Sequence, residues 1–324
     1  MLAEGGGGGS AASVDVAVVV PTYCRPHLLE RLVAGLEGQT LPADQFEVVI
    51  VDNNSPDDTS ERIAALAEAS PLRVRQLVEC ERGPAATRNA GWRTTSTDVV
   101  AFIDDDCVPE PEWLAAGLQA MHADARLGVV QGCTKKPAAS RTGDWSLSRE
   151  IVAPTPFFEA CNIFYRRGAL DDTGGFDQDI AYYGEDTSLG WAVMEAGWSR
   201  GFAAGAVAYH DIEERGVRYH LRVGLLERNA ARLAKRFPGF RREACWRPWA
   251  FRRENAMFAL AFVGLVLATR KPVAIVLALP YARMRLPGPD HPRRARFMVE
   301  RMLVDAARVT GTTLGSLRYR TFVL

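Results

Sequence analysis

The chain has 324 residues, of which 48% are hydrophobic and 24% charged. This composition excludes an intrinsically disordered protein and predicts one large domain with an appendage, or two domains. The formal net charge is zero, but residues 1–212 carry 16 Lys and Arg against 31 Asp and Glu, whereas residues 213–324 carry 23 against 8. The resulting change from −15 to +15 predicts different partners for the two parts.

The cysteines and the N-terminus exclude further classes of protein. No two cysteines form a C-x-x-C pair, so neither a zinc knuckle nor a disulfide framework is indicated, and we expect reduced thiols in the cytoplasm. Residues 1–13 lack a basic region and a long apolar run, so we expect a flexible tail and no signal peptide. The glycines of this tail precede the first strand, which is the wrong place for a dinucleotide-binding fingerprint.

Strand and helix patterns alternate along the chain after this tail. β-Branched apolar runs predict strands, and apolar residues three or four positions apart predict helices. We expect strands at 14–23, 46–55, 72–80 and 99–103, and helices at 26–39, 57–69 and 86–95. The alternation predicts βαβ units on a mostly parallel sheet, in which the strand 99–103 is buried on both faces.

The pattern is less regular beyond Trp113, and no internal repeat is present. We expect a strand at 127–135, a mixture of loop, strand and helix start at 154–170, a Gly-rich turn followed by a helix within 171–198, and a short strand at 205–210. The helix within 171–198 can be capped by Asp186 or Thr187. The last strand ends at His210.

Three of the expected strands end in polar residues. Thr22 and Tyr23 follow the first strand, residues 52–55 the second, and the triplet Asp104 to Asp106 follows the strand 99–103. Ligands of parallel sheets gather outside the carboxyl ends of the strands. One crevice is therefore expected to collect all of these side chains.

The aspartate triplet is suited to a metal ion. In an extended segment Asp104 and Asp106 project together while Asp105 points away. Two hard oxygen ligands on one side suit Mg²⁺ or Mn²⁺. The phosphate groups of a substrate would then complete the coordination of the ion. The alternative is an exposed acidic turn whose aspartates cap a helix that starts near Pro111.

Three other side chains each allow two interpretations. His210 could be an imidazole ligand of Mn²⁺ or make an ordinary hydrogen bond. Asp186 could be a general base at a helix start or an ordinary N-cap. Arg88 could bind phosphate or nucleobase oxygens by bidentate hydrogen bonds or form an ion pair.

The order of the motifs is more informative than any one of them. The pieces are VVVPTYCRPHLLERLVAGLEGQ, VVIVDNNSPDDT, ERGPAATRNAGW, VVAFIDDDCVPEPEWL, ACNIFYRRGALDDTGGFDQ and YYGEDTSLGWAVMEAGW. In this order they resemble the family 2 glycosyltransferases of the GT-A fold, of the bacterial, membrane-associated type, over roughly residues 14–212. The resemblance implies an α/β fold with a Rossmann-like, mostly parallel sheet flanked by helices. Residues 213–324 would form a basic, partly hydrophobic helical extension.

The resemblance also implies roles for individual residues. The nucleotide sugar would be bound by Pro21, Thr22, Tyr23, Asp52, Arg88, Asp104 and Asp105, with Asp52 reading the base. The Mg²⁺ or Mn²⁺ ion would be held by Asp104, Asp106 and His210, with Asp106 as the surer ligand. Asp186 would be the general base. The sugar and acceptor side would be shaped by Asn162, Gly174, Gly175 and Glu185.

The implied reaction is a single inverting displacement that moves a hexosyl group from a nucleotide-diphosphate donor to a hydroxyl acceptor. UDP is the expected nucleotide, with GDP or dTDP as alternatives, and a lipid-linked glycan is one candidate acceptor. The expected role is cell-surface glycan, glycolipid or cell-wall synthesis. A Q-x-x-R-W element of processive synthases is absent, which favours transfer of one sugar.

Other functions stay open at this point. A transferase that loads a sugar onto a polyprenyl phosphate is the nearest alternative, and an inactive nucleotide-binding or scaffold protein is one from another class. The basic part alone would also fit nucleic-acid binding. We expect no nucleic acid as partner, because the long apolar runs of this part favour a membrane.

The basic part contains two features typical of membrane association. Residues 219–237 have helical periodicity and many Arg residues, which predicts a basic amphipathic helix on an anionic membrane surface or, alternatively, a helix packed on the catalytic domain. Two apolar runs, 256–268 and 273–279, flank the basic turn 269–272.

The first apolar run is too short to cross a membrane as a helix. Its 13 residues would span about 20 Å, short of the hydrocarbon core of about 30 Å. A helical hairpin that enters one leaflet partway, with the basic turn at the headgroups, fits better than a continuous span. The alternative is a soluble hydrophobic hairpin. We therefore expect a peripheral or monotopic protein at the cytoplasmic face of the cell membrane.

Overall fold

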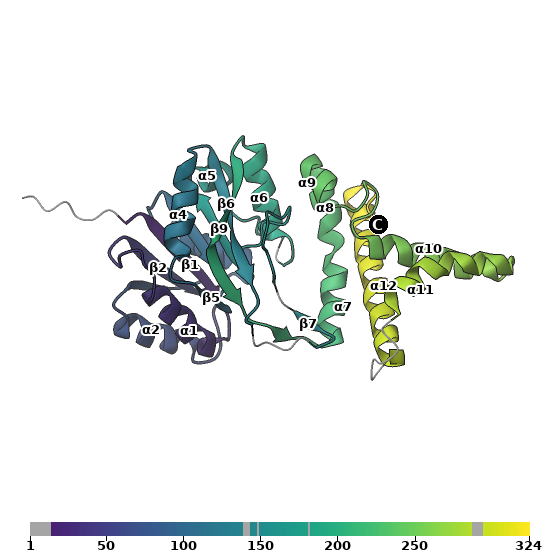
Figure 1. Ribbon diagram of the computed structural model, residues 1–324, viewed down its shortest axis with the longest axis horizontal. Helices are drawn as coiled ribbons and strands as arrows, with labels where there is room; N and C mark the ends of the chain where they lie inside the picture. The colour runs from purple at the N-terminus through teal and green to yellow at the C-terminus, as the bar shows by residue number, and fades with distance from the viewer. Residues whose placement is uncertain (1–13, 139–142, 148, 181, 287–293) are drawn as a thin grey trace, which may run out of the picture.

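The computed structural model describes residues 14–138, 143–147, 149–180, 182–286 and 294–324. It consists of an α/β domain and a group of C-terminal helices (Figure 1). The α/β domain contains β1 (Val16–Thr22), α1 (Pro26–Glu37), β2 (Phe46–Asp52), α2 (Thr59–Ala69), β3 (Arg73–Val78), α3 (Pro84–Arg93), β4 (Val99–Ile103), β5 (Cys107–Pro109), α4 (Trp113–Ala123), β6 (Leu127–Lys135), β7 (Ser146–Leu147), β8 (Asn162–Arg166), α5 (Arg167–Thr173), α6 (Glu185–Glu195), β9 (Ser199–His210) and β10 (Glu213–Glu214).

Eight strands form one sheet in the order β3-β2-β1-β4-β8-β6-β9-β5. The pairs β1–β2, β2–β3, β1–β4 and β6–β9 are parallel, whereas β8 runs antiparallel to both β4 and β6, and β5 runs antiparallel to β9. The predicted α/β fold with a mostly parallel sheet is therefore confirmed. The antiparallel β8 was not predicted, because its mixed run of residues has no clear period.

The central strands are buried on both faces, as the apolar runs predict. All five residues of β4 are inaccessible to solvent, and alternate residues of β1 pack into two different core clusters. Val19 belongs to one cluster and Val18 and Val20 to the other, because successive side chains of a strand point to opposite faces. This double burial fixes the position of the strands at whose ends the polar residues lie.

The register of the strands brings those ends to one edge of the sheet. Thr22, the last residue of β1, lies opposite Asp52, the last residue of β2. Ile103 at the end of β4 lies opposite Asn162 at the start of the antiparallel β8. The 104–106 triplet therefore emerges beside the end of β1.

Asn162 is a connector inside the sheet rather than a pocket residue. Its side chain is 1% exposed, accepts a hydrogen bond from Trp113 Nε1 at 2.8 Å, and donates to the backbone oxygens of Cys133 and Ala206, both at 3.0 Å. These contacts join β8 to α4, β6 and β9. We expected Asn162 on the sugar side of the site, but the structure places its side chain inside the fold.

The C-terminal helices are α7 (Val217–Leu226), α8 (Arg228–Arg236), α9 (Pro238–Glu243), α10 (Arg253–Ala268), the 3₁₀ helix η1 (Pro272–Ala278), α11 (Leu279–Arg285) and α12 (Arg294–Tyr319). The helix expected over 219–237 is divided into α7 and α8 at Glu227. Glu227 is 1% exposed and pairs with Arg252 at 2.8 Å and Arg308 at 3.5 Å. The two helices therefore meet at a buried carboxylate whose ion-pair partners come from distant segments of the chain. Local periodicity does not predict such a break.

The apolar face of α8 packs on the α/β domain. Ala230, Ala231, Leu233 and Ala234 belong to the same core cluster as Trp191 of α6. Of the two alternatives for this segment, the structure therefore shows for α8 the helix packed on the domain. Its apolar face is buried against protein and is not available to a membrane. The core also crosses the boundary that we expected between residues 212 and 213.

Glycines allow α12 to cross α7 and α8 at very short range. A Cβ atom on Gly311 would lie 2.5 Å from the carbonyl oxygen of Gly224, and one on Gly315 would lie 2.3 Å from that of Arg228. Real Cβ atoms do not approach backbone so closely, so only glycine fits at these two positions.

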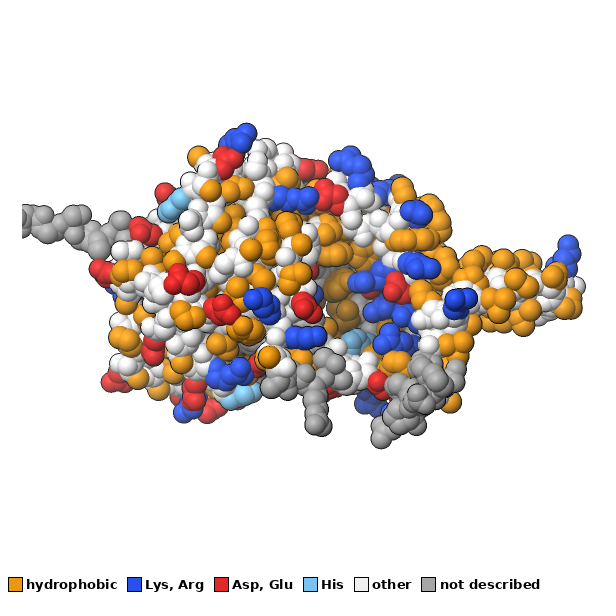
Figure 2. All heavy atoms as spheres, in the orientation of Figure 1, with side chains coloured by type: hydrophobic (Ala, Val, Ile, Leu, Met, Phe, Trp, Pro, Cys, Tyr) orange, Lys and Arg blue, Asp and Glu red, His pale blue; other side chains and the backbone are white. Residues whose placement is uncertain are grey.

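The helix α10 and the 3₁₀ helix η1 form a hairpin that projects from the rest of the molecule (Figure 1). Figure 2 shows this projection covered with hydrophobic side chains and ending in basic ones. The exposed apolar residues are Phe262, Val263, Leu265, Val266, Leu267, Val273, Ile275, Val276 and Leu279. Among the described residues, no helix is both long and apolar enough to span a membrane.

We expect Asn162→Ala to lower the free energy of unfolding by about 3 kcal/mol, since a buried amide with three hydrogen bonds is lost and the Trp113 indole N–H is left unpaired. Denaturant unfolding followed by circular dichroism measures this change. The control Gln119→Ala, at an exposed position of α4, should stay within about 0.5 kcal/mol of the wild type. Equal stability of the two variants would contradict the connector role.

Candidate active site

A crevice of about 490 Å³ lies at the carboxyl ends of β1 and β4. It collects residues from the β1–α1 turn, the N-terminus of α3 and the triplet. Its lining consists of Pro21, Thr22, Tyr23, Cys24, Arg25, Asn53, Arg82, Gly83, Pro84, Thr87, Arg88, Asp104, Asp105, Asp106, Tyr182 and Arg215. The expected crevice is therefore present, with most of the residues that we assigned to the nucleotide sugar.

The members of the triplet have different partners. Asp105 accepts hydrogen bonds from Thr22 Oγ1 at 2.7 Å and Arg25 Nη1 at 3.2 Å, so it faces the end of β1. Asp106 Oδ2 accepts one from Arg25 Nη1 at 3.1 Å, and Asp104 Oδ1 accepts one from Arg88 Nη2 at 2.8 Å. Burial raises the pKa of Asp105 to about 7, although Arg25 and Thr22 act in the opposite direction. Asp105 thus ties the triplet to β1.

Arg88 is buried between two carboxylates. It is 6% exposed and pairs with Asp104 at 2.8 Å and with Glu185 Oε1 at 3.3 Å. Burial lowers the pKa of this guanidinium, but the charges of Asp104 and Glu185 raise it above its ordinary range. The ion-pair interpretation of Arg88 therefore describes this structure, and the same residue also lines the crevice.

Asp186 lies in the first turn of α6 without capping it. Gly184, with φ of 107°, precedes the helix, and no side chain forms a cap hydrogen bond. Asp186 Oδ1 accepts a hydrogen bond from the backbone N–H of Thr187 at 2.7 Å. Burial raises the pKa of Asp186 to about 7, and the charge of Glu185 adds to this effect. A carboxylate with a pKa near neutrality is suited to general base catalysis.

Asp106 and His210 offer a place for a divalent cation. Asp106 Oδ1 is buried and has no hydrogen-bond partner among the described residues, and His210 Nε2 lies 3.5 Å from it. His210 Nδ1 lies 2.7 Å from the backbone oxygen of Asp211, and if Nδ1 carries the proton, Nε2 presents its lone pair to the site. Ligand atoms of Asp106, Cys107 and His210 lie within 4.8 Å of one another. These residues fit a metal ion, whereas Asp104 is paired with Arg88 and lies outside this group.

Several residues of the site were missed in the sequence. Arg25 bridges Asp105, Asp106 and Glu213, the last at 2.7 Å. Arg82 lies over the ring of Tyr23, 4.6 Å from its centroid. The signal for Arg25 was its place directly after the first polar strand end, whereas no local pattern points to Glu213.

Three predicted site residues, Asp52, Gly174 and Gly175, do not line the crevice. Asp52 is 1% exposed and accepts hydrogen bonds from the hydroxyl and backbone N–H of Ser55, while its neighbour Asn53 lines the crevice. Gly174 and Gly175, with φ of 76° and 83°, line a second cavity.

Comparison with known proteins identifies the domain. Residues 17–177 match the model of the family described as "Glycosyl transferase family 2". This chain belongs to glycosyltransferase family 2. The match ends before α6, so the roles of Asp186 and His210 stay predictions that rest on geometry and on the resemblance.

Curated relatives of this family 2 chain include two named glycosyltransferases. The glycosyltransferase AglE of Haloferax volcanii is 27% identical over 220 residues, which cover 64% of this chain and 71% of AglE. The pre-mycofactocin glycosyltransferase of Mycobacterium tuberculosis is 29% identical over 239 residues, which cover 69% of this chain and 48% of the relative. The chain thus spans about half the length of the second relative.

A solved structure shares the fold. The mannosyltransferase PcManGT of Pyrobaculum calidifontis, in complex with GDP-Man and Mn²⁺, superposes with a TM-score of 0.60 at 21% identity, covering 95% of this chain and 87% of its own. The GT-A fold expected from the resemblance is confirmed.

We expect the turnover rate to rise with pH and to be half-maximal near pH 7, because Asp186 with a pKa of about 7 accepts a proton only when ionised. Initial rates at saturating substrates across neutral pH measure this. A rate that does not change with pH through neutrality would contradict the base role.

Asp186→Asn is the matched variant, because the amide keeps the shape but cannot accept the proton. It should abolish transfer and leave nucleotide binding nearly unchanged, as measured by calorimetry. Normal turnover by this variant would exclude Asp186 as the base.

Proposed function

We propose that this family 2 protein is an inverting, metal-dependent glycosyltransferase that moves a sugar from a nucleotide-diphosphate donor to a hydroxyl acceptor. Family membership and the names of the relatives support glycosyltransferase activity. The observation that carries the finer proposal is the crevice at the ends of β1 and β4, where the triplet, Arg88 and the start of α6 meet. The GDP-Man complex of the structural neighbour supports a nucleotide sugar as donor.

The proposed reaction assigns the proton transfer to Asp186. Its carboxylate accepts the proton of the acceptor hydroxyl, and the oxygen attacks the anomeric carbon. The bond from that carbon to the diphosphate oxygen breaks, and its electron pair leaves with the nucleoside diphosphate, so the anomeric configuration inverts. Arg25 and Arg82 line the same crevice and would offset the negative charge of the diphosphate.

The expected metal is Mg²⁺ or Mn²⁺, and Asp106 with His210 would hold it. A carboxylate suits both ions, while the imidazole favours Mn²⁺. When bound, the ion would neutralise charge on the leaving diphosphate. Arg25 contacts the other oxygen of Asp106 and must adjust if that oxygen also binds the ion.

For the substrates we propose a UDP-hexose, with GDP or dTDP as alternative nucleotides, and an acceptor in cell-surface glycan or glycolipid synthesis. The exposed apolar hairpin favours a lipid-linked acceptor. Transfer to the phosphate oxygen of a polyprenyl phosphate is the alternative to a hydroxyl acceptor. A screen of nucleotide sugars that detects the released nucleoside diphosphate with Mg²⁺ or Mn²⁺ present tests the donor.

Asp106→Ala should weaken nucleotide binding in the presence of Mn²⁺ by about tenfold or more and leave binding in EDTA unchanged, because it removes a metal ligand. Calorimetry with UDP and GDP, with and without Mn²⁺, measures this. Asp44→Ala, at an exposed position in the α1–β2 loop, is the control and should bind like the wild type. Unchanged affinity of Asp106→Ala with Mn²⁺ would refute the metal role.

We also propose that the hairpin of α10 and η1 enters one leaflet at the cytoplasmic face of the cell membrane. Its apolar residues are exposed along both arms, for example Phe262 at 61% and Val273 at 75%. Water contact with so much apolar surface is unfavourable, whereas a shallow position in a leaflet buries it. Arg270 and Lys271 at the turn would then reach the headgroups.

Phe262→Glu combined with Val273→Glu should move the protein from the membrane fraction to the supernatant, because charged side chains oppose entry into hydrocarbon. The wild type should resist extraction by high salt. Sedimentation of membranes with and without a salt wash measures both. Complete release of the wild type by salt alone would exclude insertion.

A further inference from the structure

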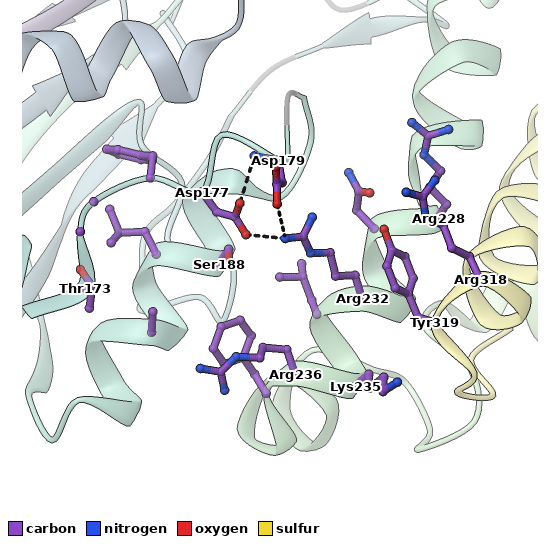
Figure 3. A pocket seen from close by; sticks show the side chains of 18 residues that line it. Thr173, Asp177, Asp179, Ser188, Arg228, Arg232, Lys235, Arg236, Arg318 and Tyr319 are labelled. Carbon is purple, nitrogen blue, oxygen red and sulfur yellow. Dashed lines mark hydrogen bonds and ion pairs between the residues drawn. The ribbon is translucent and has the colours of Figure 1, made fainter.

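A second cavity, of about 970 Å³, lies between the catalytic domain and the C-terminal helices and shares no lining residue with the crevice. The turn after α5 and one face of α6 form one side, and α8 with the end of α12 forms the other (Figure 3). Its charged lining residues are Asp177, Asp179, Arg228, Arg232, Lys235, Arg236 and Arg318. Five cations therefore face two carboxylates across this cavity.

The crossing of α8 and α12 places two of these cations on neighbouring backbones. At Gly315 of α12, a Cβ atom would lie 2.3 Å from the Arg228 carbonyl oxygen. Arg318 follows Gly315 by three positions, so it lies on the same face of α12, about one turn further on. Arg228 and Arg318 thus extend from two helices whose backbones are in close contact. Figure 3 shows both side chains on the same side of the cavity.

The carboxylates of the cavity do not neutralise this pair. Arg232 lies 2.7 Å from Asp177 and 3.7 Å from Asp179, so both acids are already shared with that residue. Within the described part of the chain, Arg228 and Lys235 have no hydrogen-bond or ion-pair partner, and the contact of Arg318 is with the ring of Tyr319, 5.7 Å from its centroid.

Arg228, Lys235 and Arg318 are exposed and line the same cavity, so their charges are available to an anion. We propose that this cavity binds a phosphate-bearing ligand through Arg228 and Arg318, with Lys235 as a third cation. The planar guanidinium fork matches phosphate oxygens bidentately, which a point charge does not. The apolar floor, with Leu189 and Leu233, leaves room for the group that carries the phosphate.

This site is separate from the crevice, although Gly174 and Gly175, which the resemblance assigned to the sugar and acceptor side, line it. It lies on the face of α6 formed by Ser188, Leu189 and Ala192 and uses none of the residues assigned to the donor or the base. A bound ligand would contact both α6 and the C-terminal helices, so it would also stabilise their packing. The phosphate could belong to a soluble molecule or to a lipid headgroup.

Calorimetric titration of the full chain with pyrophosphate in EDTA tests the site, because EDTA removes cations that would recruit pyrophosphate to Asp106. We expect the double variant Arg228→Gln, Arg318→Gln to bind about tenfold more weakly or worse, since charge-assisted hydrogen bonds are lost. Arg228→Lys with Arg318→Lys keeps the charge and should lose less affinity. Its circular dichroism and that of the Gln variant should match the wild type.

The control removes two exposed arginines outside the cavity, Arg218→Gln and Arg242→Gln, and should bind like the wild type. A second titration uses vesicles of phosphatidylcholine with and without phosphatidylglycerol. Loss of pyrophosphate binding in the cavity variant supports a soluble phosphate ligand. Loss of only the phosphatidylglycerol-dependent binding supports a lipid headgroup. If the cavity variant and the control behave alike in both titrations, the proposal is wrong.

Discussion

The guanidinium of Arg88, buried between Asp104 and Glu185, joins the end of β4 to the start of α6 through α3. Two carboxylates in a place with so little water would repel each other and resist ionisation without a cation between them. The same contact sets where Asp186 stands, because it is the next residue after Glu185 in the first turn of α6. The distance between the triplet and the proposed base therefore depends on one arginine.

Arg25 likewise holds carboxylates together on the other side of the triplet. It binds Asp105, Asp106 and Glu213, so it connects the turn after β1 to the short strand β10 that pairs with β7. The other oxygen of Asp106, Oδ1, has no hydrogen-bond partner among the described residues and lies 3.5 Å from His210 Nε2. The crevice thus keeps one acidic oxygen available for a cation while the other acids are held by arginines.

Part of the C-terminal region, chiefly α8, packs into the core of the catalytic domain. The apolar residues of α8 pack into the cluster that contains Trp191 of α6, and the glycines of α12 let that helix lie directly on α7 and α8. The large positive charge of this part is consequently divided. Some arginines pair with carboxylates, such as Arg252 with the buried Glu227, and others line the cavity beside α6.

The sequence by itself determined the order of strands and helices in the first domain, the polar strand ends and the family, because apolar periodicity and the motifs around the strand ends are local properties. It also located most of the crevice, including Thr22, Arg88 and the triplet. Only the tertiary structure decided the partner of each charge. Arg25 meets Asp105 across 80 positions of chain, and Asn162 of the antiparallel β8 bonds to residues of α4, β6 and β9. Such contacts depend on strand register and helix crossings, which no local pattern encodes.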